Sequence, residues 1–507
     1  MIRRHITPAL ITFVALLLGC LGSPLFGREW RLTAALSLVP AAAAGAILAG
    51  RRDGGHAGIG KKWRRVGILL LSASAGCLLG AFSQVRMWNA ADRAFLSMPE
   101  GDVTGITGIV VQDSSLSRRG DTVLRLAMRE ASSSRTGIAA RARGSLLLFV
   151  SGDYRFSIGQ RILVHARPSR LLTFGPEQWM GRARRADVTS RGFTLPLWAF
   201  RAEARDWLHR TVSGVGYPAS ALLEALLIGV REDVPSDLYE DFMRTGSLHI
   251  LALSGLHVTV LYGVVVGLFW FLRARWRTFL AATLVLLFYQ FLAGFMPSLL
   301  RATVMIVLGG GAALLDRDAE PLNILALSGI VLLLIDPFQA FTLSFQLSFL
   351  ALAGILVIGA LLQRPLASRL PGFLLLAFAM SAGAQAATLP LVIARFGTYY
   401  PSGLAAGLIL VPLTTGYLWA GLAWIPLSLV PWPLLHDACA RGFAVFYQVI
   451  SSSAEMLSRV PGLVFEPSLV PWLAAGAGVA VVLAATVLPL KRGTVHGARR
   501  ADTSGAA

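Results

Sequence analysis

The stretch GSLHILALSGLHVTVLYGVVVGLFWFL, residues 246–272, restricts the fold more than any other part of the chain. After its first five residues it is apolar enough to cross a bilayer, which takes about 20 such residues in a helix. Its opening turns nevertheless carry His249, Ser254, Gly255 and His257. On an ideal helix His249 and His257 lie about 80° apart, so we expect one broad face to hold both imidazoles while Ser254 lies elsewhere.

These polar residues allow three interpretations. Ionisable groups at membrane depth are costly and usually face a bundle interior or a watery cavity, and Gly255 would let another backbone approach closely, so the stretch can mark the mouth of a channel. The two histidines could instead cap a wet helix end or bond a neighbour. A membrane-embedded hydrolase would use Ser254 as its nucleophile and His249 or His257 as its base, but the nearest acidic residues precede the span.

The composition of the whole chain indicates a membrane protein. It is 55% hydrophobic and 14% charged, and its mean hydropathy is +0.64. Apolar runs of spanning length recur, which predicts a polytopic α-helical membrane protein. The formal net charge is +19, and Lys and Arg cluster at 51–65 and 273–277. The positive-inside rule puts these two clusters in the cytoplasm and the segment between about 86 and 250 outside it.

The pattern divides the chain into five regions. They are an N-terminal three-helix membrane segment (1–85), an extracytoplasmic β-domain (86–193), interfacial amphipathic helices (194–250), a transmembrane channel bundle (251–490) and a basic disordered tail (491–507). In the third region Arg201, Arg205 and His209 share one helical face, which we expect to lie on the outer leaflet. The run at 403–430, interrupted by two prolines, is compatible with one span or with two.

Residues 101–193 alternate short apolar runs with Gly, Ser and Asp, which is the pattern of a small all-β fold. They contain fifteen arginines, seven acidic residues and no lysine, a net charge of +8. Guanidinium groups pair with phosphates and stack on bases, so a polyanion-binding surface is one interpretation. An exported domain from a generally arginine-rich proteome is the other. The candidate nucleic-acid contacts are Arg118, Arg119, Arg141, Arg143, Arg182, Arg184 and Arg185.

Further polar residues interrupt the apolar runs of the bundle. Alone, each suits helix packing through hydrogen bonds between helices. Together with the opening stretch they indicate a polar path across the membrane. The candidate path residues outside that stretch are Arg301, Ser344, Gln346, Ser348, Gln385, Thr388 and Pro390.

Neither nucleotide nor metal chemistry is expected. The segment GHAGIGKK, residues 55–62, imitates a phosphate-binding loop, but Lys62 stands where a Ser or Thr belongs. The eight histidines form no dense cluster, and the three cysteines lack metal-binding spacing. We therefore expect no cofactor, no metal site and no enzymatic activity.

The chain resembles the ComEC family, the inner-membrane DNA channels of natural transformation. The likeness rests on LHILALSGLHV (248–258), DPFQAFTLSFQLSFLALAGI (336–355) and AQAATLPLVIARFGTYYPSGLAAGLILVPL (384–413), which occur in the family's order. It implies an OB-like fold for the external domain and a multi-pass location in a bacterial inner membrane. It also implies single-stranded DNA as substrate, with a periplasmic DNA receptor and a cytoplasmic ATP-driven translocase as partners.

The sequence departs from many members of that family, which continue into a metallo-β-lactamase-like domain. Such a domain is not in this sequence, so no nuclease activity is expected of it. The alternatives to a DNA channel are a membrane-embedded hydrolase using His249, Ser254 and His257, or a transporter of another polymer or small solute.

Overall fold

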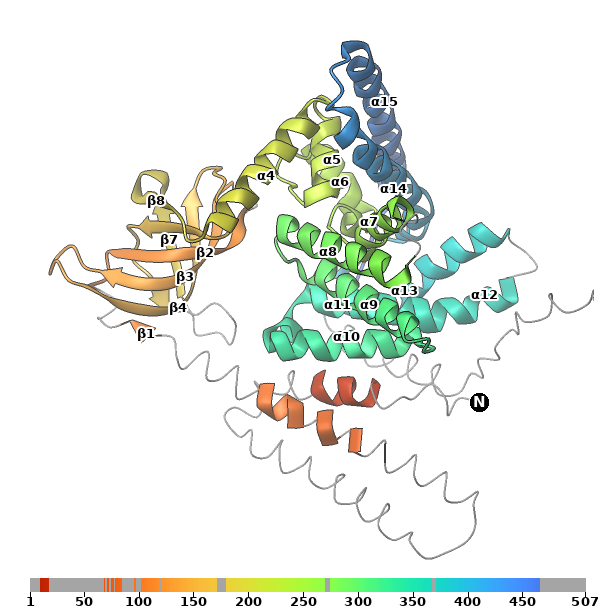
Figure 1. Ribbon diagram of the computed structural model, residues 1–507, viewed down its shortest axis with the longest axis horizontal. Helices are drawn as coiled ribbons and strands as arrows, with labels where there is room; N and C mark the ends of the chain where they lie inside the picture. Colours follow the sequence, from red (N-terminus) through yellow and green to blue (C-terminus); the bar gives the residue numbers. More distant parts are fainter. Residues whose placement is uncertain are drawn as a thin grey trace, which may run out of the picture.

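A computed structural model describes residues 10–17, 68, 71–72, 74–76, 78–83, 95–96, 102–117, 120–170, 179–269, 274–366 and 371–465. Most of the predicted N-terminal membrane segment, the predicted tail, and the candidate contacts Arg118 and Arg119 lie outside the described residues. Figure 1 shows a sheet domain beside a helical bundle, with helix α4 (Pro196–Ser213) running between them.

Eight strands form the sheet domain, and alternate side chains along them make its core. The strands are β1 (Phe95–Leu96), β2 (Gly105–Leu116), β3 (Thr122–Ser132), β4 (Ala139–Ser151), β5 (Gln160–Val164), β6 (Ser169–Arg170), β7 (Trp179–Arg184) and β8 (Val188–Phe193). Leu124 and Leu126 on β3 and Leu146 and Leu148 on β4 are fully buried, as a period of two requires. The inserted β-domain is therefore confirmed.

The strand order is β6-β7-β4-β3-β2-β5-β8, with β1 added to β4. The pair β4 and β7 is parallel, and the other pairs are antiparallel. Only Arg185–Asp187 separates β7 from β8, yet β7 pairs with β4 and β8 pairs with β5. One bent segment therefore connects β7, next to one end of the strand path, with β8 at the other end.

Helices α4, α5 (Ala219–Ile228) and α6 (Ser236–Arg244) connect the sheet to the bundle. The predicted helix α4 is present and starts at Pro196, a residue that suits the first helical position. However, Arg201 is fully buried, and the basic face of α4 contacts the β-domain and the bundle. The expectation that this face lies on the outer leaflet is wrong, because acceptors within the protein bind its arginines.

The bundle is built from nine helices in the described part of the chain. They are α7 (Gly255–Leu268), α8 (Arg275–Ala293), α9 (Pro297–Leu314), α10 (Pro321–Ile335), α11 (Leu343–Gly354), α12 (Ala360–Leu366), α13 (Gly372–Phe396), α14 (Gly403–Leu427) and α15 (Pro433–Ser458). A π-helical turn, Ile355–Gly359, joins α11 to α12. The run at 403–430 contains a single continuous helix, α14, and α15 was not predicted from the sequence.

Six helices in the described residues are long and apolar enough to cross a membrane. They are α7 with its preceding turn, α8, α9, α11 with its continuation to Gln363, α13 and α14. Helices α5 and α10 are also apolar but shorter. The chain is thus a multi-pass membrane protein, as its hydropathy predicts.

Five of these helices contact one another in a closed ring. The order of contact is α7, α9, α11, α13, α14 and back to α7. Glycines allow the closest of these contacts: a Cβ on Gly383 of α13 would lie 2.7 Å from both the Gly354 carbonyl oxygen and the Gly359 nitrogen. A larger residue at Gly383 would therefore separate α13 from α11 and its π-helical turn.

Candidate functional site

The opening stretch is not one continuous helix. A 3-10 turn covers Leu248–Ile250, and α7 begins only at Gly255, after Ser254 with an extended backbone of φ −124° and ψ 172°. Ser254 is therefore the N-cap of α7, where serine is favoured. The assumption of an ideal helix from His249 onward is wrong, because the chain between the two segments is not helical.

This break changes how the polar residues relate to one another. The Ser254 amide donates to Nδ1 of His257 at 3.0 Å, and the Ser254 hydroxyl lies 2.9 Å from the same nitrogen. His257 is only 6% exposed, whereas His249 is exposed. The two histidines do not share a face, and Ser254, expected elsewhere, contacts His257.

The contact between Ser254 and His257 is a reciprocal helix cap. Because an amide can only donate, Nδ1 of His257 accepts there, which fits a neutral imidazole with its proton on Nε2. The two Ser254 contacts are the only hydrogen bonds of the His257 ring within the described residues. A hydrolytic triad would also need a third group to orient the histidine.

Arg301 on α9 lies against the first turn of α7. A Cβ on Gly255 would lie 3.5 Å from Nη2 of Arg301 and 3.4 Å from Cβ of Ala302. The guanidinium carbon is 5.7 Å from the centre of the Phe349 ring on α11. Arg301 is 8% exposed, and its Nε and Nη1 have no hydrogen-bond partner in the described structure. The position of Arg301 thus joins three helices of the ring.

The remaining path residues lie on α11 and α13. Gln346 donates through Nε2 to the Ala340 carbonyl at 2.8 Å, while Ser344 is exposed and Ser348 is half-buried. Gln385 donates to the Ser381 hydroxyl at 3.2 Å and accepts from the Tyr399 hydroxyl at 3.1 Å.

Helix α13 continues through Pro390. Two residues earlier, Thr388 donates to the Ala384 carbonyl at 2.9 Å. The polar residues of the opening stretch thus lie in and just before α7, and the other path residues lie on α9, α11 and α13. These four polar clusters belong to four of the five helices of the ring.

The outer face of the β-domain carries the arginines expected to contact nucleic acid. Arg182 and Arg184 are exposed on β7, and Arg141 and Arg143 are exposed on β4. Phe149 of β4 pairs with Arg182 in the strand register, so the two side chains share a face. Arg185 differs from these arginines in having an internal hydrogen bond, because its Nη1 donates to the Val188 carbonyl at 2.6 Å.

An open groove of about 550 Å³ adjoins this surface. Arg182 lines it together with His165, Arg167 and Ser169. Sequence reasoning did not select His165 or Arg167, although the arginine count of the domain included Arg167. Their shared position follows from the pairing of β6 with β7, which no local pattern reveals.

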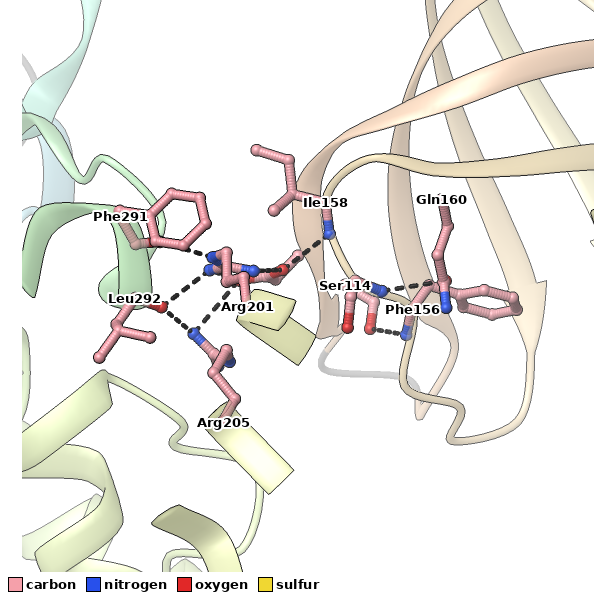
Figure 2. Close-up of polar contacts among 10 residues, drawn as sticks. Ser114, Phe156, Ile158, Gln160, Arg201, Arg205, Phe291 and Leu292 are labelled. Carbon is pink, nitrogen blue, oxygen red and sulfur yellow. Dashed lines mark hydrogen bonds and ion pairs between the residues drawn. The ribbon is translucent and has the colours of Figure 1, made fainter. Parts of the chain in front are cut away.

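Sequence reasoning also missed a polar cluster between the β-domain and the bundle, which we call the clamp (Figure 2). Arg201 donates to both carboxylate oxygens of Asp113 at 2.8 and 2.5 Å, and to the carbonyls of Phe291 and Leu292 at 2.5 and 2.9 Å. Arg205 donates to the same Leu292 carbonyl at 2.8 Å. Cations are favourable at this C-terminal end of α8, where helix carbonyls lack helical partners.

Charge and packing reinforce the clamp. Burial would raise the pKa of Asp113, but hydrogen bonding to Arg201 and the charges of Arg205 and Arg201 outweigh burial and hold this pKa below its ordinary value. The Trp198 ring stacks on Phe291 with centroids 5.5 Å apart. The clamp therefore connects β2, α4 and the end of α8.

Comparison with known proteins places the bundle in context. Over 201 residues the chain is 30% identical to ComE operon protein 3 of Bacillus subtilis. This aligned segment covers 39% of this chain and 25% of that protein. Over 187 residues it is 30% identical to an uncharacterized protein of Aquifex aeolicus, covering 37% and 43%. Over 148 residues it is 28% identical to the uncharacterized protein YcaI of Escherichia coli, covering 28% and 20%.

The chain thus spans less than half the length of each of these three relatives. No solved structure matches it. The competence protein family matches residues 226–492, more than half of the 507 residues. This match includes every helix of the ring and all of the path residues, and the chain belongs to the competence protein family.

Proposed function

We propose that this chain is a channel that carries one strand of DNA across the bacterial inner membrane during natural transformation. The observation that carries the proposal is that polar residues from four separate stretches of the sequence belong to four of the five apolar helices that contact one another in a ring. Polar groups at membrane depth usually face a cavity or a pathway. Membership of the competence protein family supports DNA as the material transported.

In this proposal the β-domain receives the strand outside the membrane. Strands β2, β3 and β4 form a meander, in which β2 also pairs with β5 and β4 also pairs with β7. This arrangement supports an OB-like barrel. Such barrels bind oligonucleotides on a strand face and its neighbouring loops. Exposed arginines beside Phe149 would hold phosphates and stack bases without preference for sequence.

Transport also needs a source of energy and a supply of DNA. We propose a cytoplasmic ATP-driven translocase and a periplasmic DNA receptor as the partners. The basic cluster at 273–277 supports a cytoplasmic position for the start of α8.

Uptake of labelled DNA into the cytoplasm of a deletion strain tests the proposal when the strain is complemented with variants of the chain. Gln385→Leu removes the partner of both Tyr399 and Ser381 within the ring and is expected to lower uptake at normal protein levels. Gln448→Leu is the matched control, because Gln448 lies on α15, outside the ring, and its hydrogen bond with Ser452 is exposed. Equal uptake in both variants would contradict the proposed path.

The contact between Ser254 and His257 is the one observation that favours a hydrolase instead. Ser254→Ala distinguishes the two functions. A hydrolase would lose nearly all activity with its nucleophile. A channel would lose only an N-cap, at about 1 kcal/mol, and would keep most of its DNA uptake.

A further inference from the structure

We propose that Arg301 and the first turn of α7 form a binding site for a phosphate group. The sources of such a group include the backbone of a transported strand, and that choice rests on the proposed function. The existence of an anion site does not, because it follows from the geometry around Arg301.

The first observation is a buried cation whose Nε and Nη1 have no hydrogen-bond acceptor among the described residues. Arg301 is 8% exposed, so more than nine-tenths of its surface is removed from solvent. Its Nε and Nη1 are fully enclosed and have no acceptor, and no carboxylate in the described residues forms an ion pair with it. The Phe349 ring, 5.7 Å away, attracts the charge but is a poor substitute for oxygen acceptors.

The second observation is what the guanidinium faces. Its Nη2 would lie 3.5 Å from a Cβ on Gly255, the first residue of α7. The first amides of a helix have no acceptor within the helix, and the helix dipole makes this end positive. In α7 the reciprocal cap already binds the amides of Ser254 and His257, which leaves those of Gly255 and Leu256 for an anion.

Two positive groups therefore lie against each other in a buried place. A guanidinium and a helix N-terminus repel each other in the absence of an anion, and both become favourable when an oxyanion lies between them. Helix N-termini bind phosphates through their amides, and arginine presents a fork of donors that matches phosphate oxygens. Gly255 suits this role, because any larger side chain than alanine would occupy the space next to Nη2.

The test uses the full chain in detergent, with inorganic phosphate as the first probe and calorimetric titration as the measurement. Arg301→Gln should weaken phosphate binding by at least roughly tenfold, the loss expected for a charge-assisted hydrogen bond. Arg301→Lys keeps the positive charge but not the forked donors of arginine, so its affinity for phosphate should lie between those of the unchanged protein and Arg301→Gln. Arg275→Gln is the control, because Arg275 is an exposed arginine whose ion pair with Asp316 is also exposed. Unchanged binding in Arg301→Gln overturns the site.

A second measurement needs no variant that could misfold. Phosphate should slow amide hydrogen exchange at 254–258 in the unchanged protein, and no change in exchange there overturns the site. A single-stranded oligothymidylate is the second probe. In Arg301→Gln the slope of log affinity against log salt should fall by about 0.7, the value for one phosphate contact on a single strand.

The two probes separate this inference from the proposed function. If phosphate binds in an Arg301-dependent way but oligothymidylate does not compete for it and no DNA enters the cell, the anion site is supported and the DNA channel is refuted. If DNA enters at the normal rate while Arg301→Gln changes neither phosphate binding nor the salt slope, the channel is supported and the anion site is refuted.

Discussion

Replacing Arg201 with methionine is expected to release the β-domain from the end of α8. Methionine keeps an unbranched side chain but removes four hydrogen bonds, two to Asp113 and two to the carbonyls of Phe291 and Leu292. Removing one partner of a buried ion pair typically costs about 3–5 kcal/mol, because the other charge is left uncompensated.

The structure places Arg201→Met at the lower end of that range. Asp113 would keep its ion pair with Arg205 at 3.3 Å and its hydrogen bond from the Ile158 amide at 2.9 Å. Its carboxylate would therefore still have a cationic partner and a hydrogen-bond donor. About 3 kcal/mol corresponds to a change of roughly a hundredfold in the docking equilibrium. Arg210→Met is the matched control, because Arg210 is an exposed arginine on the same helix.

The assay is a distance measurement between spin labels at Ile138 in the β-domain and Leu315 after α9, both of which are exposed, in a background without other cysteines. Arg201→Met should broaden the distance distribution, and Arg210→Met should leave it unchanged. Replacing Asp113, Arg201 and Arg205 together by apolar residues should cost less than Arg201→Met alone, because none of the three charges of the clamp then remains buried. A narrow, unchanged distribution in Arg201→Met would refute the reasoning.

Three further outcomes are expected. The contribution of Asp113 to docking should be fully present above its unfolded pKa of about 3.9. It should disappear as pH falls through the lower folded pKa, because the folded protein stabilises the ionised carboxylate. The same spin labels, followed from pH 7 downward, should therefore separate only below about pH 4. Gly255→Ala should retain DNA uptake, because its Cβ would meet ordinary contacts of 3.4 and 3.5 Å. Gly255→Leu should abolish uptake, because overpacking of this kind costs about 1–3 kcal/mol. Equal uptake in both variants would show that the α7–α9 contact is not tight. Arg182→Gln combined with Arg184→Gln should lower the salt slope of oligothymidylate binding by up to about 1.4, or 0.7 for each phosphate, and an unchanged slope would remove β7 from the DNA-binding surface.

Local patterns in the sequence were enough to predict the elements of this protein. Apolar runs of spanning length identified the transmembrane helices, and alternation over residues 101–193 identified the β-domain, because hydropathy period depends only on near neighbours. The amphipathic helix α15 (Pro433–Ser458) escaped this reasoning, since its buried residues recur every three or four positions, from Phe443 to Leu457, and form no continuous apolar run. The four polar clusters were also visible locally, because a polar residue inside an apolar run stands out without any knowledge of the fold.

What those residues touch depended on the path of the whole chain. Arg201 and Asp113 are 88 residues apart, and no local pattern distinguishes an arginine that binds a distant carboxylate from one that faces lipid headgroups. The break before Gly255 changed the partner of Ser254, because a helix restarted by a cap rotates every later side chain relative to the earlier turn. The ring likewise depends on packing between α7 and α14, which only the tertiary fold brings together.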